Sequence, residues 1–318
     1  MMFKPTAPSS PIVAIALRNA EAARAWRESL ARALPDAQIV LDTPDAPRAD
    51  YAVLWKPAPG FFLRQPALRA AFAAGAGVDW LIDDPDFPAS VPVYRIEDAG
   101  MAEQMSAYCC HEVLRLHYGY DRYEAQQQEG VWQELAYRAP SARTVGVFGL
   151  GVLGCAVARA VSGFGFSVRG FSRSPKAIEG IQTFDSRHGL QEFLSACDVL
   201  IIAAPSTAQT RDLFDARRLS WLRPRAYVIN IARGELLVDD DLLAALDSGQ
   251  ISGATLDVFR TEPLPATHRF WQHRFIRMTP HIAAITVIED SARQVATRIE
   301  ALLAGKSASG LIDRARAY

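Results

Sequence analysis

The sequence predicts an α/β protein made of two doubly wound domains, each with a parallel sheet. Short apolar segments of strand type alternate with helical segments along most of the 318 residues. This alternation is typical of parallel sheets whose two faces are covered by helices. It occurs in two series, one on each side of a long helical segment, and the chain length suits two domains of ordinary size.

The composition argues against several classes of partner. Lys and Arg number 34 against 35 Asp and Glu, so we expect neither nucleic acid nor a membrane surface as partner. No apolar stretch is long enough to span a bilayer, and the opening MMFKPTAPSSP lacks the apolar region of a secretory signal. None of the four cysteines has metal-ligand spacing, so we expect no metal site. These features favour a cytoplasmic protein.

The first series opens with the apolar segment IVAIAL and defines the first predicted domain. PALRAAFAAGAG has the appearance of a helix that ends in glycines. The predicted strands are 12–17, 38–42, 51–55 and 91–96, and the predicted helices are 19–35 and 66–77.

A single long helix is predicted over 101–129, between the two series. Several aromatic residues lie in or near it, namely Tyr108, Tyr118, Tyr120, Tyr123 and Trp132. The segment is either an internal connector or an arm for oligomerisation, and we favour the arm.

The second series begins at Thr144 and ends near residue 283. Its predicted strands are 144–149, 166–171, 198–204, 227–232, 254–259 and 275–279, and its predicted helices are 152–164, 189–196, 215–222 and 239–248. A last helix begins at TVIE, where Thr286 and Glu289 have the spacing of a capping box, and runs to about residue 304. We expect this helix to return to the first domain. The predicted domains are therefore 1–100 with 284–318, and 101–283 with a dimerisation helix at 101–129.

A glycine-rich turn, GLGVLG, follows the first strand of the second series. Gly149, Gly151 and Gly154 form the pattern G-x-G-x-x-G between a strand and a helix. The first glycine makes the tight turn, the second admits a pyrophosphate, and the third lets helix and strand pack closely. The helix N-terminus then stabilises the phosphate charge. The alternative is a purely structural turn, but its context favours a Rossmann-type dinucleotide site.

The sequence FSRSP stands where most dinucleotide folds have an acid that binds the ribose. Ser172 removes the repulsion that an acid would exert on the 2′-phosphate of NADP, and Arg173 can bind that phosphate through two charge-assisted hydrogen bonds. Lys176 adds a further positive charge. The alternative is a solvated surface arginine. The position favours NADPH/NADP over NADH/NAD.

Three polar residues follow three strands of the second series. Arg233 comes after YVINIA, Glu262 after ATLDVF and His281 after FIRMTP. Ligands bind beyond the carboxyl ends of the strands in such sheets, so we expect the three to meet beside the cofactor. Each one alone is more often a surface or structural residue. Together they describe reduction of a 2-keto acid: hydride to the carbonyl carbon, a proton from His281, support for the imidazolium from Glu262, and polarisation of the carbonyl by Arg233.

The other histidines lack such a context. They are His111, His117, His188, His268 and His273.

On these motifs the chain resembles the D-isomer-specific 2-hydroxyacid dehydrogenase family. The matching stretches are GVFGLGVLG, AAPSTAQT, VINIARGELLVDDDLLAALDSGQISGATLDVF, EPLP and TPHIAAIT. GAGVD, FWQH and DRARAY are most similar to its glyoxylate/hydroxypyruvate reductase branch. The resemblance implies a Rossmann cofactor domain, a flavodoxin-like substrate domain with the active site in the cleft, and a homodimer formed through the cofactor domain. The implied activity is NADPH-dependent reduction of glyoxylate to glycolate and of hydroxypyruvate to D-glycerate.

The resemblance also implies roles for individual residues. It makes Arg233, Glu262 and His281 catalytic, and Asp257 the acid that binds the nicotinamide carboxamide. The cofactor residues would be Gly149, Gly151, Val152, Leu153, Gly154, Ser172, Arg173, Lys176, Ala204, Pro205, Ile231, Ala232, Arg233, Asp257 and His281. The substrate residues would be Trp55, Gly77, Val78, Arg233 and Trp271.

Two other functions remain compatible with the sequence. One is an NAD-linked dehydrogenase acting on another D-2-hydroxy acid, which would be expected to keep an acid at position 172. The other is a non-catalytic, nucleotide-sensing protein on the same fold, because a fold does not fix a function.

Overall fold

A computed structural model describes residues 10–82, 84–187 and 189–314. The chain divides into two compact units, Met1–Gly100 with Thr286–Tyr318, and Met101–Ile285. His188, the start of MMFKPTAPSSP and the end of DRARAY lie outside the described residues. No described helix has the length and apolarity needed to cross a membrane.

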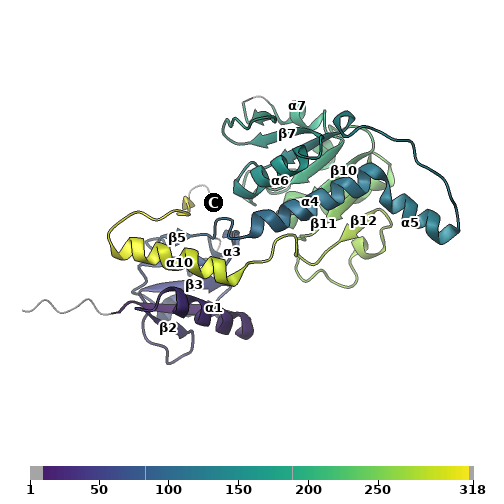
Figure 1. The fold of residues 1–318 in the computed structure, drawn as a ribbon. Coiled ribbons are helices and arrows are strands. Elements are labelled where there is room, and N and C mark those ends of the chain that lie inside the picture. The colour runs from purple at the N-terminus through teal and green to yellow at the C-terminus, as the bar shows by residue number, and fades with distance from the viewer. Residues whose placement is uncertain (1–9, 83, 188, 315–318) are drawn as a thin grey trace, which may run out of the picture. The chain divides into compact units, whose positions relative to one another are not determined.

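The first unit contains a parallel sheet with the order β2-β1-β3-β4-β5, the arrangement of flavodoxin-like doubly wound folds. Its strands are β1 Ile12–Leu17, β2 Gln38–Leu41, β3 Tyr51–Trp55, β4 Ala70–Ala73 and β5 Val93–Tyr94. Its helices are α1 Ala20–Ala33, α2 Phe61–Arg64, α3 Asp79–Ile82 and α10 Ile288–Leu303. Helices α1 and α10 pack against each other, so the end of the chain completes the unit formed by its beginning (Figure 1).

The prediction of a helix at 66–77 is wrong. Residues 70–73 form β4, which pairs with β3 and β5 inside the sheet. All four side chains of AAFA are buried. Alanine favours a helix in isolation, but a small, fully buried run also suits a central strand between two covered faces, and the tertiary context prevails.

The second unit contains a parallel sheet with the order β12-β11-β10-β9-β6-β7-β8. Its strands are β6 Thr144–Phe148, β7 Ser167–Ser172, β8 Gln182–Asp185, β9 Val199–Ile202, β10 Ala226–Asn230, β11 Ile251–Leu256 and β12 Ile276–Met278. The order reverses between β6 and β9, as in a Rossmann fold, so the predicted fold class is confirmed. The edge strand β8 was not predicted.

The second unit also contains α-helices. They are α4 Met101–Tyr118, α5 Tyr120–Glu129, α6 Val152–Ser162, α7 Leu190–Leu194, α8 Ala216–Leu219 and α9 Asp239–Asp247. Helices α4 and α6 pack against each other, whereas α5 and the segment after it project beyond the sheet (Figure 1).

Two helix predictions need correction. The predicted helix 101–129 is broken at Gly119, whose φ of 66° is left-handed and where a Cβ would lie 2.6 Å from Leu135. The predicted capping box at Thr286 and Glu289 does not form, because the N-cap of α10 is Val287, one residue later than expected, and its side chain makes no capping hydrogen bond.

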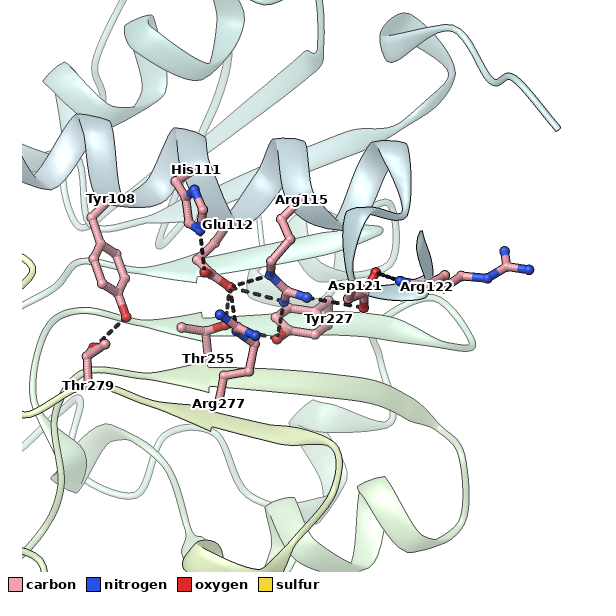
Figure 2. Close-up of polar contacts among 10 residues, drawn as sticks. All are labelled: Tyr108, His111, Glu112, Arg115, Asp121, Arg122, Tyr227, Thr255, Arg277 and Thr279. Carbon is pink, nitrogen blue, oxygen red and sulfur yellow. Dashed lines mark hydrogen bonds and ion pairs between the residues drawn. The ribbon is translucent and has the colours of Figure 1, made fainter. Parts of the chain in front are cut away.

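A buried polar network fixes α4 to the sheet (Figure 2). Glu112 and Arg115 are each 4% exposed and form an ion pair at 3.1 Å. Glu112 also accepts a hydrogen bond from Thr255 of β11 at 2.6 Å. Arg115 donates to the hydroxyl of Tyr227 on β10 at 3.1 Å and pairs with Asp121 at 3.1 Å. Because buried charges are costly unless they are paired, loss of one partner from this network should destabilise the packing of α4 on the sheet.

We predict that Glu112→Leu lowers the free energy of unfolding by about 3 kcal/mol, because it leaves the buried Arg115 short of a counter-charge. The double variant Glu112→Leu/Arg115→Met should recover at least about half of that loss. Urea denaturation followed by circular dichroism measures both. The matched control is Arg277→Leu, which removes an exposed cation 3.8 Å from Glu112 and should cost less than about 1 kcal/mol. Equal midpoints for the single and double variants would contradict this account.

Candidate active site

The glycine turn after β6 has the geometry that a dinucleotide requires. Gly149 has a φ of 109°, and a Cβ there would lie 2.5 Å from the backbone nitrogen of Ala204. A Cβ at Gly154 would lie 1.8 Å from the carbonyl oxygen of Gly149. At Gly151, by contrast, a Cβ would meet no atom within 4 Å. Gly149 and Gly154 therefore permit close packing, while Gly151 leaves an open approach to the N-terminus of α6, which fits a pyrophosphate.

The loop after β7 carries the three residues predicted to select the cofactor. Ser172 is buried, and its hydroxyl donates to the carbonyl oxygen of Ser174 at 2.7 Å. Arg173 and Lys176 are exposed. The ammonium of Lys176 donates to the carbonyl oxygen of Leu150 in the glycine turn. The loop thus places the ammonium of Lys176 against the turn, and the Ser172 hydroxyl is already used as a donor within the loop.

An acid that the sequence analysis missed lies on the neighbouring strand. Asp185 ends β8 and is the register partner of Ser172. Its buried carboxylate accepts hydrogen bonds from the backbone nitrogen of Arg187 at 2.8 Å and from its guanidinium at 2.9 Å. Ser186 donates to the carbonyl oxygen of Arg173 at 3.0 Å, which ties the two loops together. A strand predicted at Gln182–Asp185 would have drawn attention to Asp185, which ends it.

Arg233, Glu262 and His281 follow β10, β11 and β12, three adjacent strands of one sheet. His281 Nδ1 lies 2.8 Å from Glu262 Oε2, and Glu262 Oε1 accepts the backbone N–H of Phe259 at 2.9 Å. An ionised carboxylate only accepts hydrogen bonds, so Nδ1 carries a proton and Nε2 is the nitrogen left for other partners.

Glu262 is held in its ionised form. Burial opposes ionisation, but the hydrogen bonds from His281 and Phe259, with the charges of His281 and Arg233, bring the pKa of Glu262 below its ordinary value.

Arg233 reaches this edge because the loop after β10 approaches the loop after β11 closely. A Cβ at Gly234 would lie 2.0 Å from the carbonyl carbon of Phe259, so only glycine fits there. The buried Asn230 accepts from the backbone nitrogen of Ala232 at 3.1 Å and donates to the carbonyl oxygen of Arg233 at 2.9 Å. Asn230 was missed by the sequence analysis, because a polar residue at a strand end carries no distinctive signal.

The loop that carries His281 is held by Asp257, which is 1% exposed. The carboxylate accepts hydrogen bonds from Thr279 Oγ1 at 2.6 Å and from the backbone nitrogens of Ile282 at 2.8 Å and Ala283 at 2.9 Å. The backbone N–H of His281 donates to the carbonyl oxygen of Asp257 at 2.8 Å. Asp257 therefore fixes both the backbone of His281 and the residues after it.

The predicted substrate residues of the first unit lie together. The rings of Trp55 and Trp80 meet edge to face at 5.4 Å, and Trp80 Nε1 donates to the carbonyl oxygen of Gly77 at 3.2 Å. A Cβ at Gly75 would lie 3.3 Å from the Trp55 ring, and Val78 is buried next to Gly77.

Trp271, in the second unit, is exposed, and its Nε1 donates to the carbonyl oxygen of Pro265 at 2.9 Å. The remaining predicted cofactor positions are Val152 and Leu153 in the first turn of α6, and Ala204, Pro205, Ile231 and Ala232 after the carboxyl ends of β9 and β10.

A glycine turn of this kind, together with Arg233, Glu262 and His281 at one edge of a Rossmann sheet, is typical of nicotinamide-dependent oxidoreductases. The chain belongs to the D-isomer specific 2-hydroxyacid dehydrogenase family, since residues 110–283 match its NAD binding domain. The resemblance seen in the sequence is thereby confirmed. By class, the chain is a 2-hydroxyacid dehydrogenase.

Individual relatives refine this placement. The chain is 42% identical over 297 residues to glyoxylate/hydroxypyruvate reductase A of Serratia proteamaculans, covering 92% of this chain and 95% of that protein. The protein of the same name from Yersinia enterocolitica is 42% identical over 302 residues, covering 93% of this chain and 96% of that protein.

Solved structures agree with these relatives. A D-isomer specific 2-hydroxyacid dehydrogenase from Xanthobacter autotrophicus, in complex with NADPH and MES, is 35% identical with a TM-score of 0.92, covering 97% of this chain and 100% of that one. An NADPH-dependent glyoxylate/hydroxypyruvate reductase from Sinorhizobium meliloti, in complex with NADP and sulfate, is 33% identical with a TM-score of 0.91, with the same two coverages.

Because the folded-state pKa of Glu262 is depressed, its carboxylate contributes stability above the unfolded-state pKa, and this contribution disappears as the pH falls through the folded-state value. We therefore predict that Glu262→Gln lowers the melting temperature most at about pH 6 and hardly at all below about pH 3. Calorimetry at stepped pH measures the difference from wild type. Glu124→Gln, at an exposed glutamate of α5, is the control and should show no such trend. A difference that does not vary with pH would contradict the prediction.

Proposed function

We propose that the chain reduces small 2-keto acids with NADPH, taking glyoxylate to glycolate and hydroxypyruvate to D-glycerate. The observation that carries the proposal is the ion pair of His281 with Glu262, at 2.8 Å, on the same sheet edge as Arg233. The names of the relatives in Serratia proteamaculans and Yersinia enterocolitica support the choice of substrates.

The chemistry divides between these side chains. NADPH, when bound, supplies a hydride to the carbonyl carbon of the keto acid. His281 donates the proton from Nε2 to the carbonyl oxygen, because Nδ1 is engaged by Glu262. Glu262 stabilises the imidazolium before transfer and fixes the plane of the ring. The guanidinium of Arg233 binds the substrate carboxylate and polarises the carbonyl.

The residues around the glycine turn would hold the cofactor. Gly149, Gly151 and Gly154 admit the pyrophosphate to the N-terminus of α6. Arg173 and Lys176 supply positive charge for the 2′-phosphate, and no acid stands at position 172 to repel it. The absence of that acid, and the NADP bound by the Sinorhizobium meliloti structure, support a preference for NADPH over NADH.

The test is an absorbance assay at the reduced-nicotinamide band. The purified chain is mixed with NADPH or NADH and with glyoxylate, hydroxypyruvate, pyruvate or phenylpyruvate. We expect the fastest turnover with NADPH and glyoxylate or hydroxypyruvate. No turnover of any 2-keto acid, with measurable NADPH binding, would favour the non-catalytic, nucleotide-sensing function.

We predict that His281→Ala lowers kcat/KM by about 100- to 10,000-fold, because it removes the proton donor. Arg233→Ala should lower it by at least about 100-fold through loss of charge stabilisation. Fluorescence titration should show that both variants still bind NADPH. Near-normal activity in either variant would refute the role assigned to that residue.

We predict that Ser172→Asp raises the KM for NADPH about ten- to a hundredfold relative to the KM for NADH, since the new carboxylate repels the 2′-phosphate. Ser167→Asp places the same charge at the opposite end of β7 and serves as the matched control. Steady-state kinetics with both cofactors gives the ratio. An unchanged ratio in Ser172→Asp would separate this loop from cofactor choice.

We also propose that the chain is a homodimer formed through the cofactor unit. Helix α5 buries no side chain of its own, and Trp132 and Tyr137 beyond it are 100% and 78% exposed. Exposed aromatics gathered on a projecting segment are typical of a protein interface.

We expect sedimentation velocity to give a dimer for the wild type and a monomer for Trp132→Asp/Tyr137→Asp. Leu63→Asp, which alters an equally exposed side chain of the first unit, should remain a dimer. A wild-type monomer at micromolar concentration would refute the arrangement.

A further inference from the structure

A chain of hydroxyl groups links α4 to the loop that carries His281. The hydroxyl of Tyr108 on α4 lies 2.6 Å from Thr279 Oγ1, just after β12 (Figure 2). Thr279 Oγ1 lies 2.6 Å from Oδ1 of Asp257, just after β11. The three side chains come from three separate elements, and none belongs to the predicted catalytic trio.

The chemistry of the groups fixes the direction of these hydrogen bonds. Asp257 also accepts two backbone N–H groups, which is the bonding pattern of an ionised carboxylate. Thr279 must therefore donate its single hydroxyl proton to Asp257, and Tyr108 must donate to Thr279. Burial, the largest influence, raises the pKa of Tyr108 well above its ordinary value, so the phenol keeps the proton that it donates.

The loop at the end of this chain has a strained backbone. His281 has a φ of 56°, in the left-handed region that residues other than glycine rarely adopt. Its backbone N–H donates to the carbonyl oxygens of Asp257 at 2.8 Å and Thr279 at 3.0 Å. A conformation of this kind persists only when the surrounding structure imposes it. Here, Asp257 is the residue that grips the loop before and after His281.

We propose that Tyr108 and Thr279 are positioning residues for proton transfer. They orient the carboxylate of Asp257, which in turn holds the backbone of His281 so that its imidazole meets both Glu262 and the substrate. This inference rests on the proposed function and extends it to residues that touch neither substrate nor cofactor. It assigns Asp257 the role of holding the loop around His281, in addition to the cofactor contact that the family resemblance implies.

Substitutions at Tyr108 and at Thr279 should lower kcat by different factors. A cavity of about 300 Å³, lined by Tyr108, Thr279 and four neighbours, lies beside the hydroxyl pair and has room for water. Water there can replace the donor lost in Tyr108→Phe, so we expect kcat to fall only about two- to tenfold. Thr279→Val deprives Asp257 itself of a donor. We expect it to lower kcat about tenfold to a hundredfold, since small displacements of a catalytic group cost that much.

The experiment compares Tyr108→Phe, Thr279→Val and Thr279→Ser with wild type, and uses Tyr118→Phe on the same helix as the control. We expect kcat to fall in Thr279→Val with a smaller change in KM for the keto acid. The solvent deuterium isotope effect on kcat should rise, because proton transfer becomes slower. Thr279→Ser keeps the hydroxyl and should restore both values. A merely structural role would lower stability without changing the isotope effect.

Several results would overturn the proposal. One is wild-type kcat in both Thr279→Val and Tyr108→Phe. Another is equal damage in Thr279→Ser and Thr279→Val, and a third is weakened NADPH binding with unchanged kcat at saturation.

The ring nitrogen resonances of His281, assigned by comparison with His281→Asn, give a readout that needs no turnover. They should move in Thr279→Val and return in Thr279→Ser. If wild type reduces no 2-keto acid but these resonances behave as expected, the proposed function fails while the positioning stands. Unmoved resonances would overturn the positioning itself.

Discussion

The grip of one buried carboxylate on one loop determines the geometry of the candidate active site. Asp257 accepts three hydrogen bonds at the carboxyl end of β11, and all three come from the loop after β12. The left-handed backbone at His281 lies within this loop, and such a conformation persists only when the surrounding structure imposes it. Because His281 is held, its Nδ1 meets Glu262, and Nε2 remains for other partners. The pair of His281 and Glu262 is therefore built from backbone contacts as much as from side chains.

Close approach of backbones does the same for the rest of the site. Gly234 brings the loop of Arg233 against the loop that follows β11, and Gly154 brings α6 against the turn at Gly149. Neither position has room for a Cβ atom. Parallel strands deliver their loops to one edge, and these glycines let the loops come close enough for side chains from different strands to act together.

Local patterns were sufficient to predict the fold class, the glycine turn and the sheet edge at which Arg233, Glu262 and His281 gather. They failed where contacts between distant segments determine the local structure. The run AAFA became a strand because β3 and β5 enclose it. At the break in the helix, Leu135 lies so close to Gly119 that a Cβ atom there would be 2.6 Å from it. The hydroxyl chain from Tyr108 joins residues 171 positions apart, and no spacing rule foretells such a contact.

The contrast between the packed glycines of the turn and the exposed cations after β7 has an evolutionary consequence. Neither Gly149 nor Gly154 has room for a Cβ atom, so substitution at either position would disrupt the packing of the turn. Arg173 and Lys176 are exposed on the loop after β7 and can be exchanged at little cost to packing. Under the proposed function, the contribution of these two cations to cofactor preference can change by substitution at the surface, while the packed glycine turn stays the same.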